Sequence, residues 1–140
     1  MVKNVVVRRI DTLVDIVEST DLSAEEFMRG PMLTFMKKVP GSPIAVVIRL
    51  LVSEGRRHPD LVDYYYENVV SKGLGAIRKF VARGVERGEL KPEAAELQPH
   101  LFLSPMMLAM IWGLIFTNQP LDTDKLLDDQ VEILLAQLKA

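Results

Sequence analysis

The sequence predicts an all-α domain, a bundle of about six helices joined by short connections. Apolar residues recur at spacings of three and four along most of the chain, as they do on one face of a helix. Prolines and glycines separate these periodic segments, as expected where helices begin and end. Strand signals do not repeat in the same way, and we find no internal repeat and no interdomain linker.

The first helix is predicted over residues 2–19, where the apolar side chains form one stripe: Val6, Ile10, Leu13, Val14 and Val17. The next start carries a capping box, in which Ser23 and Glu26 each satisfy the other's free backbone N–H. Gly30-Pro31 is expected to break or kink this second helix, because proline removes a donor and disfavours helical geometry in the preceding residue. A further turn or two is predicted from Met32 to Lys38.

Ser42 and Pro43 start the next helix as N-cap and first helical residue. Its many β-branched residues make a strand conceivable, but the spacing and the proline-led start favour a helix. The buried stripe is predicted to be Ile44, Val47, Ile48, Leu51 and Val52. Gly55 marks its end.

A long helix is predicted from Pro59 to about Arg87, with Gly88 as a left-handed C-terminal residue. Its predicted apolar face comprises Leu61, Val62, Tyr65, Tyr66, Val69, Ile77, Phe80 and Val81. Three glycines lie inside this helix, where each is less favourable than alanine. Such glycines indicate a close helix contact or a bend.

Pro92 begins another helix, predicted to reach about Thr117 with kinks at Pro99 and Pro105. Residues 101–116 carry no charge. This segment is shorter than the roughly 20 residues that cross a bilayer, so we expect it in a core or a subunit interface. The last helix is predicted from Thr123 to about Lys139, with a narrow seam that suits a partner helix: Leu127, Val131, Leu134 and Leu138.

The composition describes one globular domain, because 49% of the 140 residues are hydrophobic and 26% are charged. A net charge of −2 lacks the basic excess of a nucleic-acid module. There is no cysteine and no signal peptide, which is compatible with a cytoplasmic protein. We expect no membrane segment.

Catalytic chemistry is not indicated. His58 and His100 each lack further ligands at helical spacing, so neither predicts a metal site. The carboxylate pairs lie at helix starts or on polar faces, where acidic residues complement the helix dipole. No phosphate-binding glycine motif or nucleophile elbow is present. We therefore predict no enzyme, no catalytic residue, no metal and no cofactor.

Six of the seven methionines fall in two short stretches, 28–36 and 106–110. Methionine is adaptable and suits a pocket for varied apolar ligands, although core filling is the simpler explanation for any one of them. The run Tyr64-Tyr65-Tyr66 spans too much of a helix surface for all three to face inward. Arg49 stands in an apolar helix, where it would pair with an anionic effector if it faced inward, or else lie exposed.

Two stretches carry a family resemblance. In residues 49–61, Ser53-Glu54 is followed by Pro59-Asp60-Leu61 at the start of a long, aromatic-rich helix. In residues 82–90, a helix end rich in arginine and glycine closes with Gly88-Glu89-Leu90. With the uncharged segment and the final amphipathic helix in the same order, the chain resembles the C-terminal domain of TetR-family transcriptional repressors.

The resemblance implies a homodimer whose last two long helices form a four-helix interface, and a pocket for a small-molecule effector. The methionines and aromatic residues suggest that this effector is apolar or aromatic. It also implies an N-terminal helix-turn-helix that reads DNA. That domain is not found in residues 1–140, which we interpret as one ligand-binding and dimerisation domain whose first helix, about 2–19, would connect to it.

Pocket residues vary within the family, so candidates come from position and chemistry: Met32, Phe35, Met36, Arg49, Tyr66, Met106 and Met110. The candidate interface rests on the seam and the uncharged helix: Leu108, Trp112, Leu127, Val131, Leu134 and Leu138. The alternative is a helical interaction or anti-repressor module without a ligand, which predicts a solid core. An enzyme would need His100 and a carboxylate in one cleft.

Overall fold

The computed structural model describes residues 2–140, with side chains from residue 5 onward. In this part of the chain the backbone is helical almost throughout, and one isolated bridge joins Leu90 to Lys139. The α-helices are α1 (Val2–Ser19), α2 (Ala24–Phe27), α3 (Leu33–Lys38), α4 (Pro43–Glu54), α5 (Pro59–Tyr65), α6 (Ser71–Glu86), α7 (Ser104–Ile115) and α8 (Thr123–Leu138). The shorter turns are the π-helical η1 (Met28–Met32) and η3 (Tyr66–Val70), and the 3₁₀-helical η2 (Val39–Gly41), η4 (Pro92–Glu96) and η5 (Pro99–Phe102).

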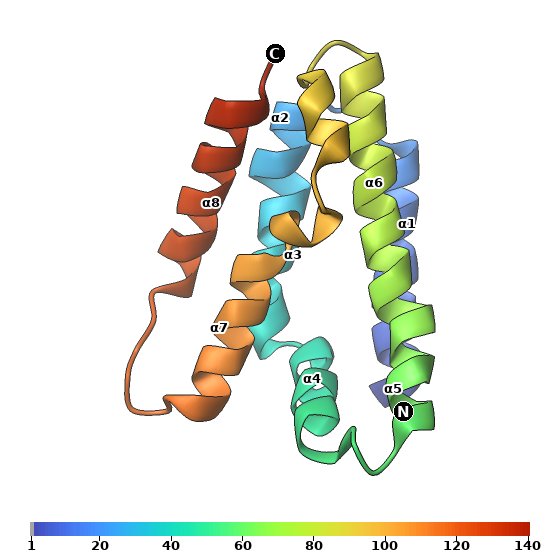
Figure 1. Cartoon of the computed structure of the whole chain (residues 1–140), viewed down its shortest axis with the longest axis vertical. Coiled ribbons are helices and arrows are strands. Elements are labelled where there is room, and N and C mark those ends of the chain that lie inside the picture. Colours follow the sequence, from blue (N-terminus) through green and yellow to red (C-terminus); the bar gives the residue numbers. More distant parts are fainter. Residues whose placement is uncertain (1) are drawn as a thin grey trace.

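Several of these elements follow one another without a break. The segments α2, η1, α3 and η2 form one helical rod, and α5, η3 and α6 form another. Together with α1, α4, α7 and α8 they make six rods, so the predicted all-α bundle of about six helices is confirmed. Figure 1 shows α1 and α6 along one side, α7 and α8 along the other, and α2 and α3 between them.

Helices α1 and α6 lie side by side and run parallel. Lys72 pairs with Asp11 (3.0 Å between Nζ and Oδ1), and Lys79 pairs with Glu18 (2.8 Å between Nζ and Oε1). The partners in both pairs are separated by the same 61 residues, as a parallel arrangement requires. Arg83 adds a hydrogen bond from Nη1 to the carbonyl of Val17 (2.8 Å). These polar contacts flank the apolar contact between the two helices.

The helix boundaries follow the predicted local signals. Both hydrogen bonds of the capping box form between Ser23 and Glu26. The hydroxyl of Ser42 accepts the backbone N–H of Ile44, with Pro43 in the first turn of α4. Gly88 has a φ of +75°, the left-handed conformation expected after a helix end. The first helix has its predicted bounds of residues 2–19.

Pro31 does not break its helix, although a break was one of the two outcomes expected at Gly30-Pro31. It lies inside η1, a π turn that connects α2 to α3 directly. Proline cannot donate to the carbonyl one α-turn earlier, and the wider π turn accommodates the missing bond. A second π turn, η3, lies inside the predicted long helix and had no sequence signal of this kind.

The predicted helix from Pro92 to Thr117 is wrong in its first half. Pro92 and Pro99 each open a separate 3₁₀ turn, and Gln98 before Pro99 is extended (ψ 126°). The residue before a proline is driven out of the helical region, so the chain turns at this point rather than bending slightly. Pro105 lies in the first turn of α7, where proline is tolerated, and does not kink it.

The predicted apolar stripes are confirmed at most positions, but three residues are exposed. Val52 is 65% exposed at the end of α4, whereas Ile44 and Val47 are buried. On α5 and η3, Val62 and Tyr66 are exposed while Tyr65 and Val69 are buried. Val62 lies before the π turn, on α5, whose inward residues are Leu61 and Tyr65, whereas Tyr66 is the first residue of the π turn, where α-helical spacing no longer applies.

Helix α8 is held against the rest of the chain along its length. Its side chains Leu127, Val131, Leu135 and Leu138 are buried in the core. Arg29 of η1 pairs with Glu132 and Glu25, and Lys139 also pairs with Glu25 (2.7 Å). At the C-terminal end, backbone bonds join Lys91 N–H to the Leu138 carbonyl (2.7 Å) and Ala140 N–H to the Glu89 carbonyl (3.1 Å).

Gly84 is a close-approach position on α6. A Cβ at this residue would lie 2.7 Å from Cδ1 and 3.0 Å from Cγ of the buried Leu90. We predict that Gly84→Ala lowers the free energy of unfolding by about 1–3 kcal/mol, the usual cost of overpacking. Denaturant unfolding measures this change.

The matched control is Gly75→Ala on the same helix, where an added Cβ meets nothing within 4 Å. This variant should gain up to about 1 kcal/mol, because alanine is the better helix former. Equal effects of the two substitutions would contradict the close packing of Gly84 on Leu90.

The ion pairs of α8 predict an acid-dependent loosening. Hydrogen bonds from Lys139 and then Arg29 lower the pKa of Glu25, and the hydrogen bond from Arg29 lowers the pKa of Glu132, from usual values of 4.5. A carboxylate with a lowered pKa stabilises the folded state above its unfolded pKa, and this contribution is lost as the pH falls through the folded pKa. We expect the α8 amides to exchange hydrogen faster below pH 4.5 after correction for intrinsic rates.

Glu132→Gln should reduce this acid dependence, whereas Glu96→Gln, at an exposed residue outside every ion pair found in residues 5–140, should retain it. Acid dependence that survives in Glu132→Gln would assign the loosening to other groups.

Candidate ligand pocket

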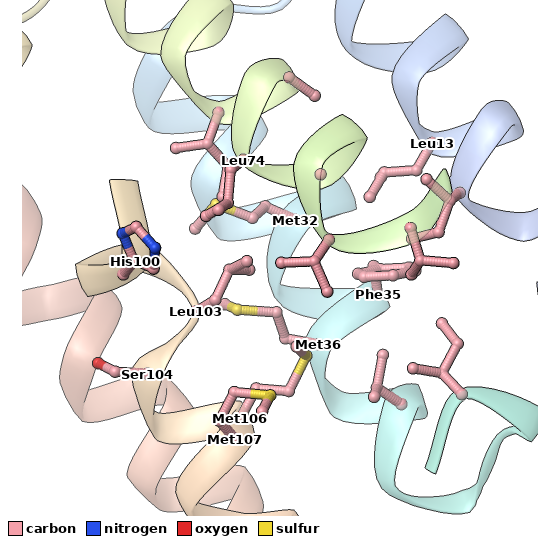
Figure 2. A pocket seen from close by; sticks show the side chains of 18 of the residues that line it. Leu13, Met32, Phe35, Met36, Leu74, His100, Leu103, Ser104, Met106 and Met107 are labelled. Carbon is pink, nitrogen blue, oxygen red and sulfur yellow. The ribbon is translucent and has the colours of Figure 1, made fainter. Parts of the chain in front are cut away.

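A cavity of about 350 Å³ lies inside the bundle. Its walls come from α1, the α2–η2 rod, α4, the η3–α6 rod, and the segment from η5 to α7. Figure 2 shows side chains from these segments converging on one space, with Met32, Met36 and Leu103 near its middle. The volume falls in the range of roughly 300–1,000 Å³ that is typical of small-molecule sites.

The lining is apolar except at one side. Of the residues that line the cavity, only His100 and Ser104 carry polar side chains, and both are exposed. The Ser104 hydroxyl donates to the Leu101 carbonyl (3.3 Å), which leaves the imidazole as the free polar group of that side. Such a lining favours an apolar ligand, because each buried methylene contributes about 0.8 kcal/mol and a buried polar group without a partner is costly.

The cavity exists because neighbouring helices leave a space that no side chain fills. Gly73 of α6 lines the cavity, and a Cβ built on it meets nothing within 4 Å. Nearby, Phe27 and Phe80 close one part of the lining with ring centroids 4.9 Å apart. Glycine in a helix interior is unfavourable, and a larger side chain at Gly73 would occupy part of this volume.

Five of the seven residues predicted for ligand binding line this cavity: Met32, Phe35, Met36, Met106 and Met110. Arg49 and Tyr66 do not line it and are exposed. On α4 the inward positions are Ile44 and Ile48, so Arg49 falls on the outer side. Tyr65 is the buried tyrosine of its run, and burial raises the pKa of its hydroxyl.

The residue-by-residue prediction missed the walls contributed by α1 and α6. These include Ile10, Leu13, Val17, Gly73, Leu74, Ile77 and Phe80. The apolar stripe of the first helix and the interior glycines of the long helix were visible in the sequence. Neither signal says which stripe faces empty space rather than another side chain.

A profile of the family described as "Tetracyclin repressor-like, C-terminal domain" matches residues 31–133. The chain belongs to this family. It is a regulatory domain of the tetracyclin repressor type, as the sequence resemblance implied. Searches among curated proteins and among solved structures found no significant match. None of the helices within residues 2–140 has the length and apolar character needed to cross a membrane.

The outer faces of α7 and α8, together with the residue that follows α7, carry part of the exposed apolar surface of this tetracyclin repressor-like domain. Exposed residues here are Leu108, Ile111, Ile115, Phe116 and Ile133. Trp112 is half-buried against Phe116, with ring centroids 4.7 Å apart, and its indole N–H donates to the Gln119 carbonyl (2.7 Å). Pro105, Met106, Ala109 and Met110 form the opposite, buried face of α7.

The candidate interface residues are therefore divided between the surface and the core. Leu108 is exposed, and Trp112 and Leu134 are half-buried. The seam residues Leu127, Val131 and Leu138 are instead buried against α8's own chain. A partner subunit could not contact these three side chains in this arrangement. The spacing correctly indicated a packed helix, but spacing does not distinguish packing within a chain from packing between chains.

Polar residues of the domain do not converge on a reaction centre. His58 precedes α5 and makes no side-chain capping bond, and His100 stands at the edge of the cavity. Among the residues that the structure describes, no three His, Asp or Glu side chains gather where they could hold a metal ion. No carboxylate lines the cavity beside His100.

Proposed function

We propose that the domain binds a small, mainly apolar effector in the cavity and pairs with a second copy of itself through the outer faces of α7 and α8. The observation that carries the ligand proposal is the apolar cavity of about 350 Å³ that Gly73 lines. A helical interaction module without a ligand would be expected to have a solid core. The cavity therefore favours sensing over interaction alone.

Helix α1 connects the cavity to regulation in this proposal. Ile10, Leu13 and Val17 of α1 line the cavity, so an effector that enters it contacts this helix directly. In the TetR-family arrangement, a DNA-binding domain precedes the helix that corresponds to α1, and DNA is contacted through that domain. A shift of α1 on effector binding would change the spacing of two such domains in a repressor dimer, acting in the cytoplasm.

Filling the cavity should abolish binding without harming the fold. We predict that Gly73→Leu removes binding of the neutral apolar dye N-phenylnaphthylamine, because the new side chain enters open space in the lining. The domain should stay folded, since leucine is a better helix former than glycine by up to about 1 kcal/mol. Dye fluorescence measures the binding, and thermal unfolding measures the stability.

Gly75→Leu is the matched control, because Gly75 lies on the same helix with equally open space but does not line the cavity. It should bind the dye as the unaltered domain does. Undiminished dye binding by Gly73→Leu would exclude this cavity as the binding site.

The dimer proposal rests on the exposed apolar stripe of α7. Leu108, Ile111 and Ile115 recur at spacings of three and four opposite the buried face of the helix, and Ile133 of α8 is also exposed. The two helices pack together along one edge of the bundle (Figure 1). A helix that is apolar on all sides is normally buried on all sides, so the stripe calls for a partner.

We predict that Ile115→Glu makes the domain monomeric. A charge placed in an apolar interface is unpaired and costs several kcal/mol, which weakens dimerisation by about a hundredfold or more. Sedimentation at tens of micromolar measures the change, a range in which an interface of roughly 1,600 Å² normally persists.

Val52→Glu is the matched control, since Val52 is also β-branched and 65% exposed against 63% for Ile115. It should leave the dimer intact. If Val52→Glu dissociated the dimer and Ile115→Glu did not, the interface would lie on α4 and not on α7.

A further inference from the structure

A second, open recess lies beside the cavity, between α1 and the segment from η1 to α3. We call it the basic groove. Its volume is about 700 Å³, and three cationic side chains line it: Arg8 and Arg9 from α1, and Lys38 from the end of α3. No acidic residue lines it. The remaining lining is apolar apart from two threonines.

The cations of the basic groove lack counter-charges. Arg8, Arg9 and Lys38 are exposed and form no ion pair within residues 5–140. By contrast, the adjacent Lys37 pairs with Asp128 (2.8 Å), and Lys72 and Lys79 pair with acidic residues of the same helix α1. A recess whose charged lining residues are all cationic has a positive potential and attracts an anion.

Two apolar residues belong to both recesses. Leu13 and Phe35 line the cavity and also line the basic groove, so these side chains form the boundary between them. Figure 2 shows both at the side of the cavity opposite His100. Each is half-buried, and each side chain moves between discrete staggered rotamers. The Leu13 and Phe35 side chains are therefore all that the two recesses share, and a ligand occupying both would pass between them.

We propose that the effector is an amphipathic monoanion of the fatty-acid type, with its hydrocarbon chain in the cavity and its carboxylate in the basic groove. This inference rests on the proposed ligand-binding function and names the ligand class. The chain passes between Leu13 and Phe35, and the carboxylate accepts hydrogen bonds from the guanidinium and ammonium groups.

The sizes of the recesses agree with this class. A methylene takes up about as much space as a water molecule, whose share of the liquid is roughly 30 Å³, so about 350 Å³ accommodates roughly ten carbons. The opposite side of the cavity offers His100 and Ser104 but no arginine or lysine. A carboxylate, which keeps its negative charge, is therefore bound more favourably in the basic groove than beside His100 and Ser104.

Calorimetric titration with decanoate and with decanol tests the charge of the head group. The two probes share the hydrocarbon chain and differ in the anion. We expect the unaltered domain to bind decanoate more tightly, with an affinity that falls as salt is added. The triple variant Arg8→Gln, Arg9→Gln, Lys38→Gln should bind decanoate about tenfold or more weakly and bind decanol as before. Each exposed cation contributes a few-fold to the decanoate affinity, and the three contributions multiply.

The control is the triple variant Arg49→Gln, Arg56→Gln, Arg78→Gln, which removes the same charge. These arginines are exposed, form no ion pair within residues 5–140, and line neither recess. Both affinities should stay within about twofold of the unaltered domain, because distant exposed charges are screened.

Three results would overturn the proposal. Equal binding of decanoate and decanol by the unaltered domain would remove the role of the anion while leaving the cavity as a ligand site. If the groove variant lost affinity for decanoate and decanol alike, the three cations would be acting on the stability of the fold and not on the carboxylate. If neither decanoate nor decanol bound while N-phenylnaphthylamine still did, fatty-acid-like ligands would be excluded and the cavity would remain a ligand site. If none of the three compounds bound, the proposed ligand-binding function itself would be refuted.

Discussion

The parallel contact between α1 and α6 is the constraint on which the rest of the structure depends. Ion pairs at 11–72 and 18–79 hold the two helices in one register, and Arg83 ties the end of α1 to α6. Both helices then present apolar side chains to the same interior space. The cavity and the basic groove both include residues of α1, so a ligand in either recess would contact this helix.

The interior is left unfilled because the surrounding rods are held from outside it. The salt bridges of Arg29 and Lys37 secure α8 to the rod that runs from α2 to η2, and the bonds at Leu90 and Lys139 join the end of α8 to the segment after α6. The 3₁₀ turns η4 and η5 carry the chain from α6 to α7 along the edge of the cavity. Methionines provide much of the remaining lining, and their flexible side chains adapt to different occupants without a change of backbone.

Sequence reasoning recovered what depends on local chemistry and failed where geometry is set by distant contacts. The caps at Ser23 and Ser42, the left-handed Gly88 and the family were all readable from short patterns. The π turns at Met28–Met32 and Tyr66–Val70 were not, because a single wide turn leaves no periodic pattern in the sequence. The clustered methionines do line the cavity, whereas Arg49 and Tyr66 lie on the exposed sides of their helices. Neighbouring residues of a helix point about 100° apart, so one can face the interior while the next faces solvent.

The position of the only tryptophan has a practical consequence. Trp112 packs against Phe116 in a tilted arrangement at the edge of the exposed α7 stripe, and it lines neither recess. Its intrinsic emission is therefore a natural spectroscopic reporter of subunit association, since a partner helix would dehydrate the indole. Occupancy of the interior would leave that signal nearly unchanged, so assembly and ligand uptake can be followed separately in one unlabelled sample.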